Sequence, residues 1–521
     1  MTRPNILIIM TDQHSRKLAG CYGNGLVRTP NLDRLAEEGM VLENAYCPAP
    51  LCVPSRMSFM TSRTPSRNRV WKNNHILSSN TPTWAHYLGI AGYRTALIGR
   101  MHFEGPDVAH GFLERPVGEF SAKHPGAPER GGPRFQAVPR GTSGQSRISV
   151  EAAGTGSTSY RWFDSHVTDH AVEFLRGAAR SGCNERGTTT GDSSAGADAG
   201  RPFAAVVGYV LPHCPFVADK DLFDYYYGRV DVPRREQELP PAIRRWQEHR
   251  GVFEPPLPEE RIRVARAAYF ALVEEMDANI GRVLAALEDS GLDEDTLVIY
   301  TSDHGEMAGE HGCWWKSSYY EGSAGVPLIA RLPGVIEAGA RSRVVCNLLD
   351  VGPTVVEFAG RPASDGGSAL GAASTMRDVD GRSLTRVLGG DESAWENTTY
   401  SELVDSRGGF HSASRMVRSS DWKLSLFHDG DALPPILHNV AEDPDEIVNR
   451  VEDPAAAPVL QKLTSLLYDG WNPDWAAAES ERLQHDYETL SSWGRTVRPD
   501  YFPETLAVPP EGTIETDVEL R

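Results

Sequence analysis

The sequence predicts an α/β fold, a central sheet covered by helices on both faces, followed by a smaller C-terminal α+β domain. Two observations support the sheet: short apolar runs rich in β-branched residues, and helical stretches that alternate with them along the chain. A third observation, a Gly-, Ser- and Ala-rich stretch at residues 361–376, indicates a domain boundary. The length of 521 residues also favours two domains. We therefore expect a larger domain at residues 1–378 and a smaller one with a tail at residues 379–521.

Five apolar runs in the first domain have the length and composition of buried parallel strands. Each is dominated by apolar residues, without the regular polar alternation of a strand that has one face in water. The expected sheet is therefore mixed but mostly parallel. The expected strands are residues 5–10, 95–99, 203–210, 297–301 and 326–331.

Helices are expected between these strands, at residues 82–91, 168–178 and 259–287. The third is the clearest, because its apolar residues recur three or four positions apart and form one stripe. Strands that alternate with such helices indicate a sheet with both faces covered. The stripe consists of Val264, Ala268, Leu272, Met276, Ile280, Val283 and Leu287.

The second domain reads as a small antiparallel sheet and a helix, followed by an irregular tail rich in Trp, Tyr and Asp. The helix is expected at residues 458–468. A further segment, residues 182–201, resembles a loop because it is rich in Gly, Ser and Ala. The expected strands of this domain are residues 399–404, 416–418, 423–427 and 436–440.

Composition and charge exclude several classes of function. The net charge of −19 argues against nucleic-acid binding, which requires basic surface. The apolar run at residues 6–10 is too short for a signal peptide or a membrane span, so we expect a cytoplasmic protein without membrane contact. Seven scattered cysteines lack the spacing of metal fingers, and reduced thiols are the default in that compartment.

Polar side chains follow four of the predicted strands at the point where each strand ends. Any one of them alone would be interpreted as a loop residue or a helix cap. Ligands of α/β sheets bind beyond the carboxyl ends of the strands, so the coincidence at one edge predicts a functional site. The residues concerned are Asp12 and Gln13, Arg100 and His102, His213, and Asp303 and His304.

The pentapeptide CVPSR, residues 52–56, allows three interpretations: a buried structural thiol, a thiolate nucleophile, or a cysteine that is chemically changed. A cysteine phosphatase loop would need Arg six residues after the cysteine, where this chain has Ser58. A chance match to C-x-P-S-R occurs in on the order of one chain in a thousand. Pro54 suits a first helical turn, which places Cys52 and Arg56 at the positive end of a helix, an anion-binding location.

These residues resemble the sulfatase family of the alkaline-phosphatase superfamily, with the nearest likeness to choline-sulfatase-like bacterial members. The resemblance spans roughly two thirds of the chain in family order, and it implies an alkaline-phosphatase-like fold. The matching segments are residues 3–13, 29–56, 93–103, 208–216, 301–316, 380–384 and 437–446.

The resemblance implies that Cys52 is oxidised to formylglycine by a maturation enzyme. One hydroxyl of the formylglycine hydrate attacks sulfur and the other drives elimination of sulfate, which divides the reaction into two easier steps. The resemblance also implies a divalent cation that polarises the sulfate. We expect Ca²⁺, with Mg²⁺ and Mn²⁺ as alternatives. The implied metal ligands are Asp12, Gln13, the modified Cys52, Asp303 and His304.

Roles in proton transfer follow from the same resemblance. Asp303 is the base toward the attacking hydroxyl, and Arg56 holds the hydrate and the metal shell. His102 accepts the proton of the remaining hydroxyl, while His213 and Lys316 face the ester oxygen of the leaving group.

The chain departs from the family pattern at several positions. Arg100 stands where the family usually has Lys, which keeps the charge but changes the donor geometry. Gln13 replaces an aspartate, as in choline-sulfatase-like members. Residues 114–159 do not resemble the choline-pocket segment, and a quaternary ammonium ligand would need an aromatic cage. The aromatic residues close to Lys316 in sequence, which either contribute to such a cage or pack in the core, are Trp314, Trp315, Tyr319 and Tyr320.

The predicted function is therefore the hydrolysis of a small-molecule sulfate monoester. The main alternative is a phosphonate monoester or phosphodiester hydrolase on the same formylglycine scaffold, which residues 208–218 also resemble. A third hypothesis is a catalytically silent metal- or anion-binding protein with unmodified Cys52. The sequence does not decide whether the protein forms a homo-oligomer.

Overall fold

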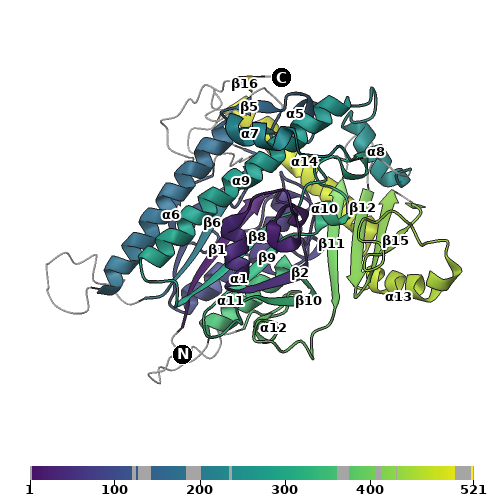
Figure 1. The fold of residues 1–521 in the computed structure, drawn as a ribbon. Coiled ribbons are helices and arrows are strands. Elements are labelled where there is room, and N and C mark those ends of the chain that lie inside the picture. Colours follow the sequence, from purple (N-terminus) through teal and green to yellow (C-terminus); the bar gives the residue numbers. More distant parts are fainter. Residues whose placement is uncertain are drawn as a thin grey trace.

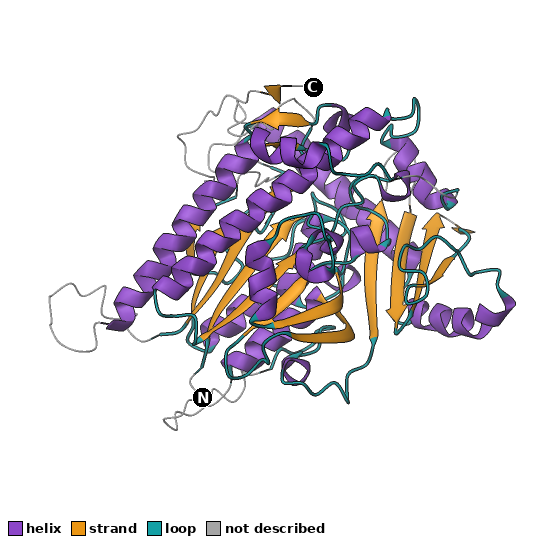
Figure 2. Ribbon diagram, viewed as in Figure 1, coloured by secondary structure: helices purple, strands orange, loops and turns teal. Residues whose placement is uncertain are grey.

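The computed structural model describes residues 3–119, 125–126, 142–183, 201–233, 238–360, 375–405, 412–429, 431–498 and 518–519. Its centre is an eight-stranded sheet in the order β10-β2-β9-β8-β1-β6-β3-β4 (Figure 1). Helices cover both faces of this sheet, and a second, antiparallel sheet lies beside it (Figure 2). This architecture confirms the predicted fold class.

The strands of the central sheet are mostly parallel. β1 lies in the middle, with Leu7 opposite both Ala205 of β6 and Val298 of β8, so its backbone groups are paired on both sides. The strands are β1 (Asn5–Asp12), β2 (Met40–Tyr46), β3 (Arg94–Gly99), β4 (Glu114–Val117), β6 (Phe203–Pro212), β8 (Thr296–Ser302), β9 (Leu328–Arg331) and β10 (Ala340–Asn347).

One predicted strand has the wrong direction. Residues 326–331 were expected to be parallel, but β9 is antiparallel to both β2 and β8. Between β8 and β9 the described chain forms only two short helical turns, Glu310–Gly312 and Glu321–Ala324. Two parallel neighbours would need a crossover connection, usually a longer helix, over one face of the sheet. Strands β2, β4 and β10 were not predicted, because polar residues interrupt their apolar patterns, as Arg341 and Arg343 do in β10.

Alternate residues of β1 face two different cores, which explains why the strand is apolar throughout. Ile6 and Ile8 pack in one cluster with residues of α2, α4, α11 and α12. Leu7 and Ile9 pack in the other with residues of α1, α6, α7 and α9. Each face of the sheet is thus covered by its own helical layer.

The predicted helices are present, although two of them are longer than the patterns indicated. The stretches at 168–178 and 259–287 belong to helices of 25 and 31 residues. The helices are α1 (Pro30–Glu37), α2 (Cys52–Thr61), α3 (Pro65–Asn68), α4 (Trp84–Ile90), α5 (Arg147–Glu151), α6 (Ser159–Cys183), α7 (Lys220–Tyr227), α8 (Pro241–His249), α9 (Glu259–Asp289), α10 (Glu321–Ala324), α11 (Val351–Ala359), α12 (Thr385–Leu388), α13 (Ala457–Tyr468) and α14 (Pro473–Val497).

The second sheet is antiparallel, as predicted, and α13 and α14 pack against it. A third, small sheet pairs three short strands, β5 (Gly154–Gly156), β7 (Val217–Ala218) and β16 (Val518–Glu519). The strands of the second sheet are β11 (Thr398–Asp405), β12 (Ser412–Ser419), β13 (Trp422–Asp429), β14 (Asp431–Ala432) and β15 (Ile436–Asn439).

The prediction of an irregular tail is wrong for residues 473–497, which form α14. The helix is mostly polar, and its few buried residues include Ala476 and Ser480, so its sequence lacks the apolar stripe that predicts a packed helix. Besides the second sheet, it contacts residues of the first domain. Trp475 packs edge-on against the buried Trp71, with ring centroids 5.6 Å apart.

The two predicted loop segments, 182–201 and 361–376, lie largely outside the described residues. Residues 184–200 and 361–374 are not described. The domain boundary at residue 378 stays a prediction. Within the described ranges, no helix combines the length and the apolar content that a membrane crossing requires.

Candidate active site

The four predicted strand ends meet at one edge of the central sheet. β8, β1, β6 and β3 are neighbours in that order and run parallel, so the residues that follow them lie side by side. Asp12 ends β1, Asp303 follows β8, His213 follows β6 and Arg100 follows β3. The prediction that these residues share one edge is confirmed.

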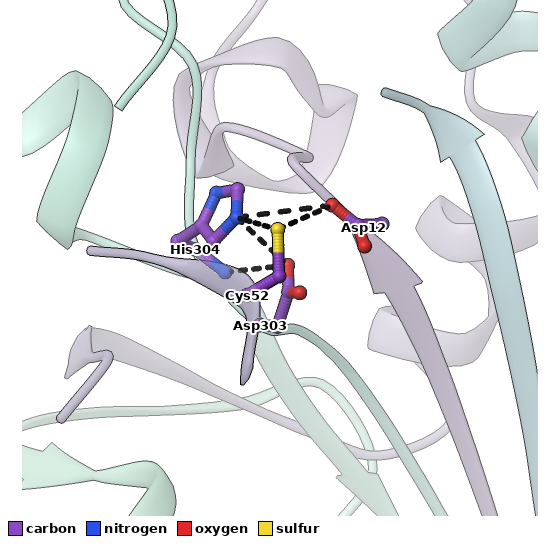
Figure 3. A group of neighbouring side chains, drawn as sticks. All are labelled: Asp12, Cys52, Asp303 and His304. Carbon is purple, nitrogen blue, oxygen red and sulfur yellow. Dashed lines mark hydrogen bonds and ion pairs between the residues drawn. The ribbon is translucent and has the colours of Figure 1, made fainter. Parts of the chain in front are cut away.

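Cys52 reaches the same edge from α2. Leu51 precedes it in an extended conformation, and Cys52 is the first residue of the helix, as the position of Pro54 predicted. The cysteine side chain is buried. Its Sγ lies 3.2 Å from Nε2 of His304 and 3.7 Å from Oδ1 of Asp12 (Figure 3). It also lies 3.4 Å from Nζ of Lys316.

Four of the predicted metal ligands form one buried cluster. One ligand atom from each of Asp12, Cys52, Asp303 and His304 lies within 4.8 Å of the others (Figure 3). Burial, the largest effect, lowers the pKa of His304, so the ring is neutral near pH 7. Its Nδ1 contacts the carbonyl oxygen of Gly305 at 3.0 Å, which leaves Nε2 directed at the cluster. The donor set fits a divalent cation, because its carboxylates and neutral imidazole are groups that such ions accept.

Arg56 joins the two carboxylates of this cluster. Its Nε donates to Oδ2 of Asp303 at 2.8 Å and its Nη2 to Oδ2 of Asp12 at 3.2 Å. It also donates to the backbone carbonyls of Thr11 and Arg100. The guanidinium is fully buried, so these bonds fix the ends of β1 and β3 relative to the start of α2.

Positive groups surround Asp12. Burial alone would raise the pKa of this carboxyl, but Arg100, His213, Arg56 and Lys316 outweigh burial and hold it well below its usual range. Arg100 is the nearest, with Nε 2.9 Å from Oδ2 of Asp12. Asp12 is therefore ionised near neutral pH.

Arg100 also contacts His102, which follows it in the same loop. Nη2 of Arg100 lies 2.7 Å from Nδ1 of His102, and His102 has a positive φ of 60°. A non-glycine residue in this region is strained, which requires that its surroundings hold it there.

Lys316 lies at the centre of the remaining polar contacts. Its Nζ donates to Oε1 of Gln13 at 2.5 Å and lies 2.9 Å from Nε2 of His213. Burial alone would lower the pKa of Lys316, but the facing Cys52 sulfur and the Asp12 carboxylate raise it, so the amine is cationic. The side-chain oxygen of Gln13, which would bind the metal, thus accepts from Lys316 in this structure. The assignment of Gln13 as a metal ligand stays a prediction.

Three buried carboxylic acids that support the site were not predicted. Glu306 accepts from Nε2 of Gln13 at 2.5 Å, and burial raises its pKa. Glu119 accepts from the backbone N–H groups of Met101 and His102, both at 2.7 Å. Asp164 accepts from two backbone N–H groups near His213, those of Val210 and Leu211, at 2.9 and 2.8 Å.

Of these three residues, only Glu306 could have been suspected from the sequence, because it lies between Asp303 and Lys316 in residues 301–316, which match the family pattern. The other two act on backbone groups that are distant in sequence, and no residue pattern marks such a contact.

The aromatic residues near Lys316 do not form a cage. All four side chains are buried in the interior, so the core-packing alternative is correct for each of them. Nε1 of Trp315 donates to Oγ of Ser149 at 2.9 Å, and the hydroxyl of Tyr319 bonds to Ser414 at 2.9 Å. The four residues are Trp314, Trp315, Tyr319 and Tyr320.

Comparisons with known proteins agree with this geometry. A model of the family described as Sulfatase matches residues 4–361, and one described as N-sulphoglucosamine sulphohydrolase, C-terminal, matches residues 309–471. The chain is similar to a choline-sulfatase of Rhizobium meliloti (strain 1021), with 32% identity over 491 residues that cover 91% of this chain and 87% of the relative.

Solved structures share the fold. BT4656, solved in complex with its substrate D-glucosamine-2-N,6-O-disulfate, superposes with a TM-score of 0.65 at 22% identity, covering 94% of this chain and 99% of that one. The phosphonate monoester hydrolase SpPMH from Silicibacter pomeroyi superposes with a TM-score of 0.65 at 25% identity, covering 90% of this chain and 95% of that one.

Proposed function

The chain belongs to the sulfatase family of sulfuric ester hydrolases, and from this premise we propose that its nucleophile is Cys52 after conversion to formylglycine. The observation that carries the proposal is the position of Cys52 Sγ, buried between Asp12, His304 and Lys316 at the sheet edge. In the modified enzyme, the oxygens of the formylglycine hydrate take the place of this sulfur.

The conversion is a net two-electron oxidation of Cβ. It breaks the Cβ–Sγ bond and one Cβ–H bond, forms a carbonyl whose oxygen comes from water, and releases the sulfur as sulfide. The two electrons pass to an oxidant bound by the maturation enzyme. A plain thiol is a poor alternative for the reaction, because a thiosulfate ester could not eliminate sulfate from the same carbon. The hydrate can, since its second hydroxyl provides the electron pair for elimination.

A divalent cation fits the cluster of Asp12, Asp303 and His304 with the modified Cys52, and Gln13 would join it by turning Oε1 away from Lys316. Ca²⁺ suits these mostly oxygen donors, and the ion would supply Lewis-acid polarisation of the sulfate oxygens. Arg56 would hold the two carboxylates in place whether or not the ion is bound.

The remaining residues divide between the two steps. Asp303 serves as the base toward the attacking hydroxyl. Lys316 and His213, in mutual contact at 2.9 Å, stabilise and protonate the leaving oxygen. His102, positioned by Arg100, accepts the proton from the second hydroxyl during elimination.

The alternative of a phosphonate monoester or phosphodiester hydrolase is kept because SpPMH shares the fold and 25% of the sequence. We favour sulfate esters, since Arg100 is bulkier than the lysine usual in the family and leaves less room for a second substituent. Cytoplasmic location stays a prediction from the N-terminal sequence.

The experiment combines mass spectrometry and activity. The tryptic peptide of residues 35–56 contains Cys52 together with Cys47, and in active enzyme it should carry an aldehyde only at Cys52. Cys52→Ala should abolish release of sulfate from p-nitrophenyl sulfate while Cys21→Ala, at a half-buried thiol outside the cluster, retains activity. Full activity with an unmodified peptide would refute the proposal.

A further inference from the structure

A pocket of about 620 Å³ adjoins the candidate active site. Its lining includes Leu51 and Ser317, which are the chain neighbours of Cys52 and Lys316. Ser317 donates its backbone N–H to the carbonyl of Pro50 at 3.1 Å, so the two segments that carry the reactive groups also form the inner wall of the pocket. The alcohol part of a sulfate ester bound at Cys52 would extend into this space.

The outer wall comes from α14. Glu481, Gln484, His485 and Glu488 line the pocket, and their spacing of three and four residues places them on one face of the helix. The lining also includes Lys72, Asn73 and Asn74 of the first domain. Ten of the fourteen described lining residues have polar or charged side chains, so the wall offers many hydrogen-bonding groups.

A chain of hydrogen bonds organises this wall. Asn74 donates through Nδ2 to Oε1 of Gln484 at 2.8 Å, and Nε2 of Gln484 donates to Oε1 of Glu488 at 2.8 Å. These bonds fix the α14 carboxylate relative to the first domain. Acceptors held in this way favour a ligand with hydroxyl groups, each of which can donate to one of them.

The described lining does not favour a quaternary ammonium group. Its one aromatic residue is Trp246, and the guanidinium carbon of Arg250 lies 3.8 Å from the centroid of that ring. Arg250 therefore occupies the ring face that a bound cation would need. The other aromatic candidates of the sequence are buried in the core, as described above.

We propose that the leaving group of the physiological substrate is a sugar, whose hydroxyls donate hydrogen bonds to Glu481 and Glu488 of α14. This assignment rests on the proposed function, because it concerns the alcohol part of the same ester. The pocket lies within the size range of about 300–1,000 Å³ that is usual for enclosed small-molecule ligands. A sugar leaving group would distinguish the substrate of this chain from choline sulfate, after which the similar choline-sulfatase is named.

The test compares three kinds of substrate on fully modified enzyme: the 6-sulfates of glucose, galactose and N-acetylglucosamine, choline sulfate, and p-nitrophenyl sulfate. We expect at least one sugar sulfate to have a higher kcat/KM than choline sulfate. The double variant Glu481→Ala/Glu488→Ala should lower the ratio of kcat/KM for that sugar to kcat/KM for p-nitrophenyl sulfate about 10- to 100-fold.

The matched control is Asp486→Ala, which removes a carboxylate from another face of α14, where Asp486 pairs with Arg482. It should leave the ratio unchanged. Preference for choline sulfate over every sugar sulfate, or a double variant that mainly impairs choline sulfate, would overturn the inference. Absence of cleavage of every sulfate ester in the set would instead refute the proposed function.

Discussion

We expect the chemistry to depend strongly on one positive charge, that of Lys316. Its Nζ contacts Gln13, His213 and Cys52, and the side chain is buried. Lys316→Ala should lower kcat/KM for sulfate esters on the order of 10²–10³-fold, as expected for loss of one donor to a developing negative charge. Steady-state kinetics on enzyme with verified formylglycine content measures this.

The fold should tolerate the change, because Asp12 keeps Arg56 and Arg100 as partners. The melting temperature should therefore stay close to that of the wild type. Lys220→Ala is a suitable control, since this lysine is half exposed and pairs with Asp224 on α7. A large fall in melting temperature with little change in kcat/KM would assign Lys316 to the scaffold.

Asp303 provides the residue-scale test of metal binding. Asp303→Asn keeps the size of the side chain but removes a negative charge from the cluster and from Arg56. We expect the content of bound divalent metal, measured by elemental analysis after dialysis, to fall well below that of the wild type. Asp378→Asn, at an exposed carboxylate paired with Arg67, should not change it. Wild-type metal content in Asp303→Asn would contradict the assignment.

The sequence predicted the residues that meet at the sheet edge, including Arg56, but not the buried carboxylic acids that hold the surrounding loops. Asp12, Cys52 and Asp303 could be found because each stands in a short motif or directly after a strand. Glu119 and Asp164 could not, because their function is to accept from backbone N–H groups of other segments. Such contacts depend on tertiary structure and leave no local pattern.

The loop after β3 depends on a contact of this kind, made by the carboxylate of Glu119. Glu119 is buried and accepts from two successive N–H groups, while His102 at the same place has a positive φ of 60°. Glu119→Ala would leave both groups without their acceptor and release the loop. We expect kcat to fall up to about 10²-fold with a smaller change in KM, because misplacement of His102 slows the chemical step.

Glu119→Gln separates positioning from charge. Its amide oxygen can accept the same two bonds, so it should recover most of the lost kcat. Glu114→Gln, in β4 at a half-buried pair with Arg94, serves as control and should behave as wild type. If the Gln variant is as slow as the Ala variant, Glu119 acts through its charge.

At the scale of elements, the sequence predicted best where a pattern is dictated by burial. β1 and β6 are mostly apolar, α6 and α9 each pack many apolar residues in the core, and all four were expected. α14 was missed, because a helix held by polar bonds such as Asn74 to Gln484 has no apolar stripe to predict it.

A buried charge network links β13 of the second sheet to α10 and to the segment that follows β1. Nζ of Lys423 in β13 lies 2.6 Å from Glu321 and 2.5 Å from Glu446, and Arg16 also pairs with Glu321. Glu321→Gln should lower the free energy of unfolding by about 3–5 kcal/mol at pH 7, because the buried Arg16 loses its carboxylate partner and the buried Lys423 keeps only Glu446. Denaturant unfolding with the two proteins side by side measures the difference.

The same network predicts a pH dependence. Burial alone would raise the pKa of Glu321, but Lys423, Arg16 and Arg418 outweigh it and hold the pKa well below the usual range. The stabilisation is therefore present above the unfolded-state pKa of about 4.3 and is lost as the pH falls toward the folded-state value. The gap between wild type and Glu321→Gln should narrow below about pH 4.

Glu288→Gln is the matched control. Glu288 pairs with Arg34 on the surface, where an ion pair contributes about 1 kcal/mol or less. It should change stability little at any pH. A gap between wild type and Glu321→Gln that stays constant down to pH 3 would show that the carboxylate charge of Glu321 is not the source of the stabilisation.

The central claim is that the whole molecule is a sulfate-ester hydrolase rather than a phosphonate or phosphodiester hydrolase on the same scaffold. The most direct measurement compares kcat/KM for p-nitrophenyl sulfate, bis(p-nitrophenyl) phosphate and p-nitrophenyl phenylphosphonate on enzyme whose formylglycine content has been verified. Our account predicts the highest value for the sulfate, because Arg100 reduces the room for a second substituent. A higher value for the diester or the phosphonate would contradict it.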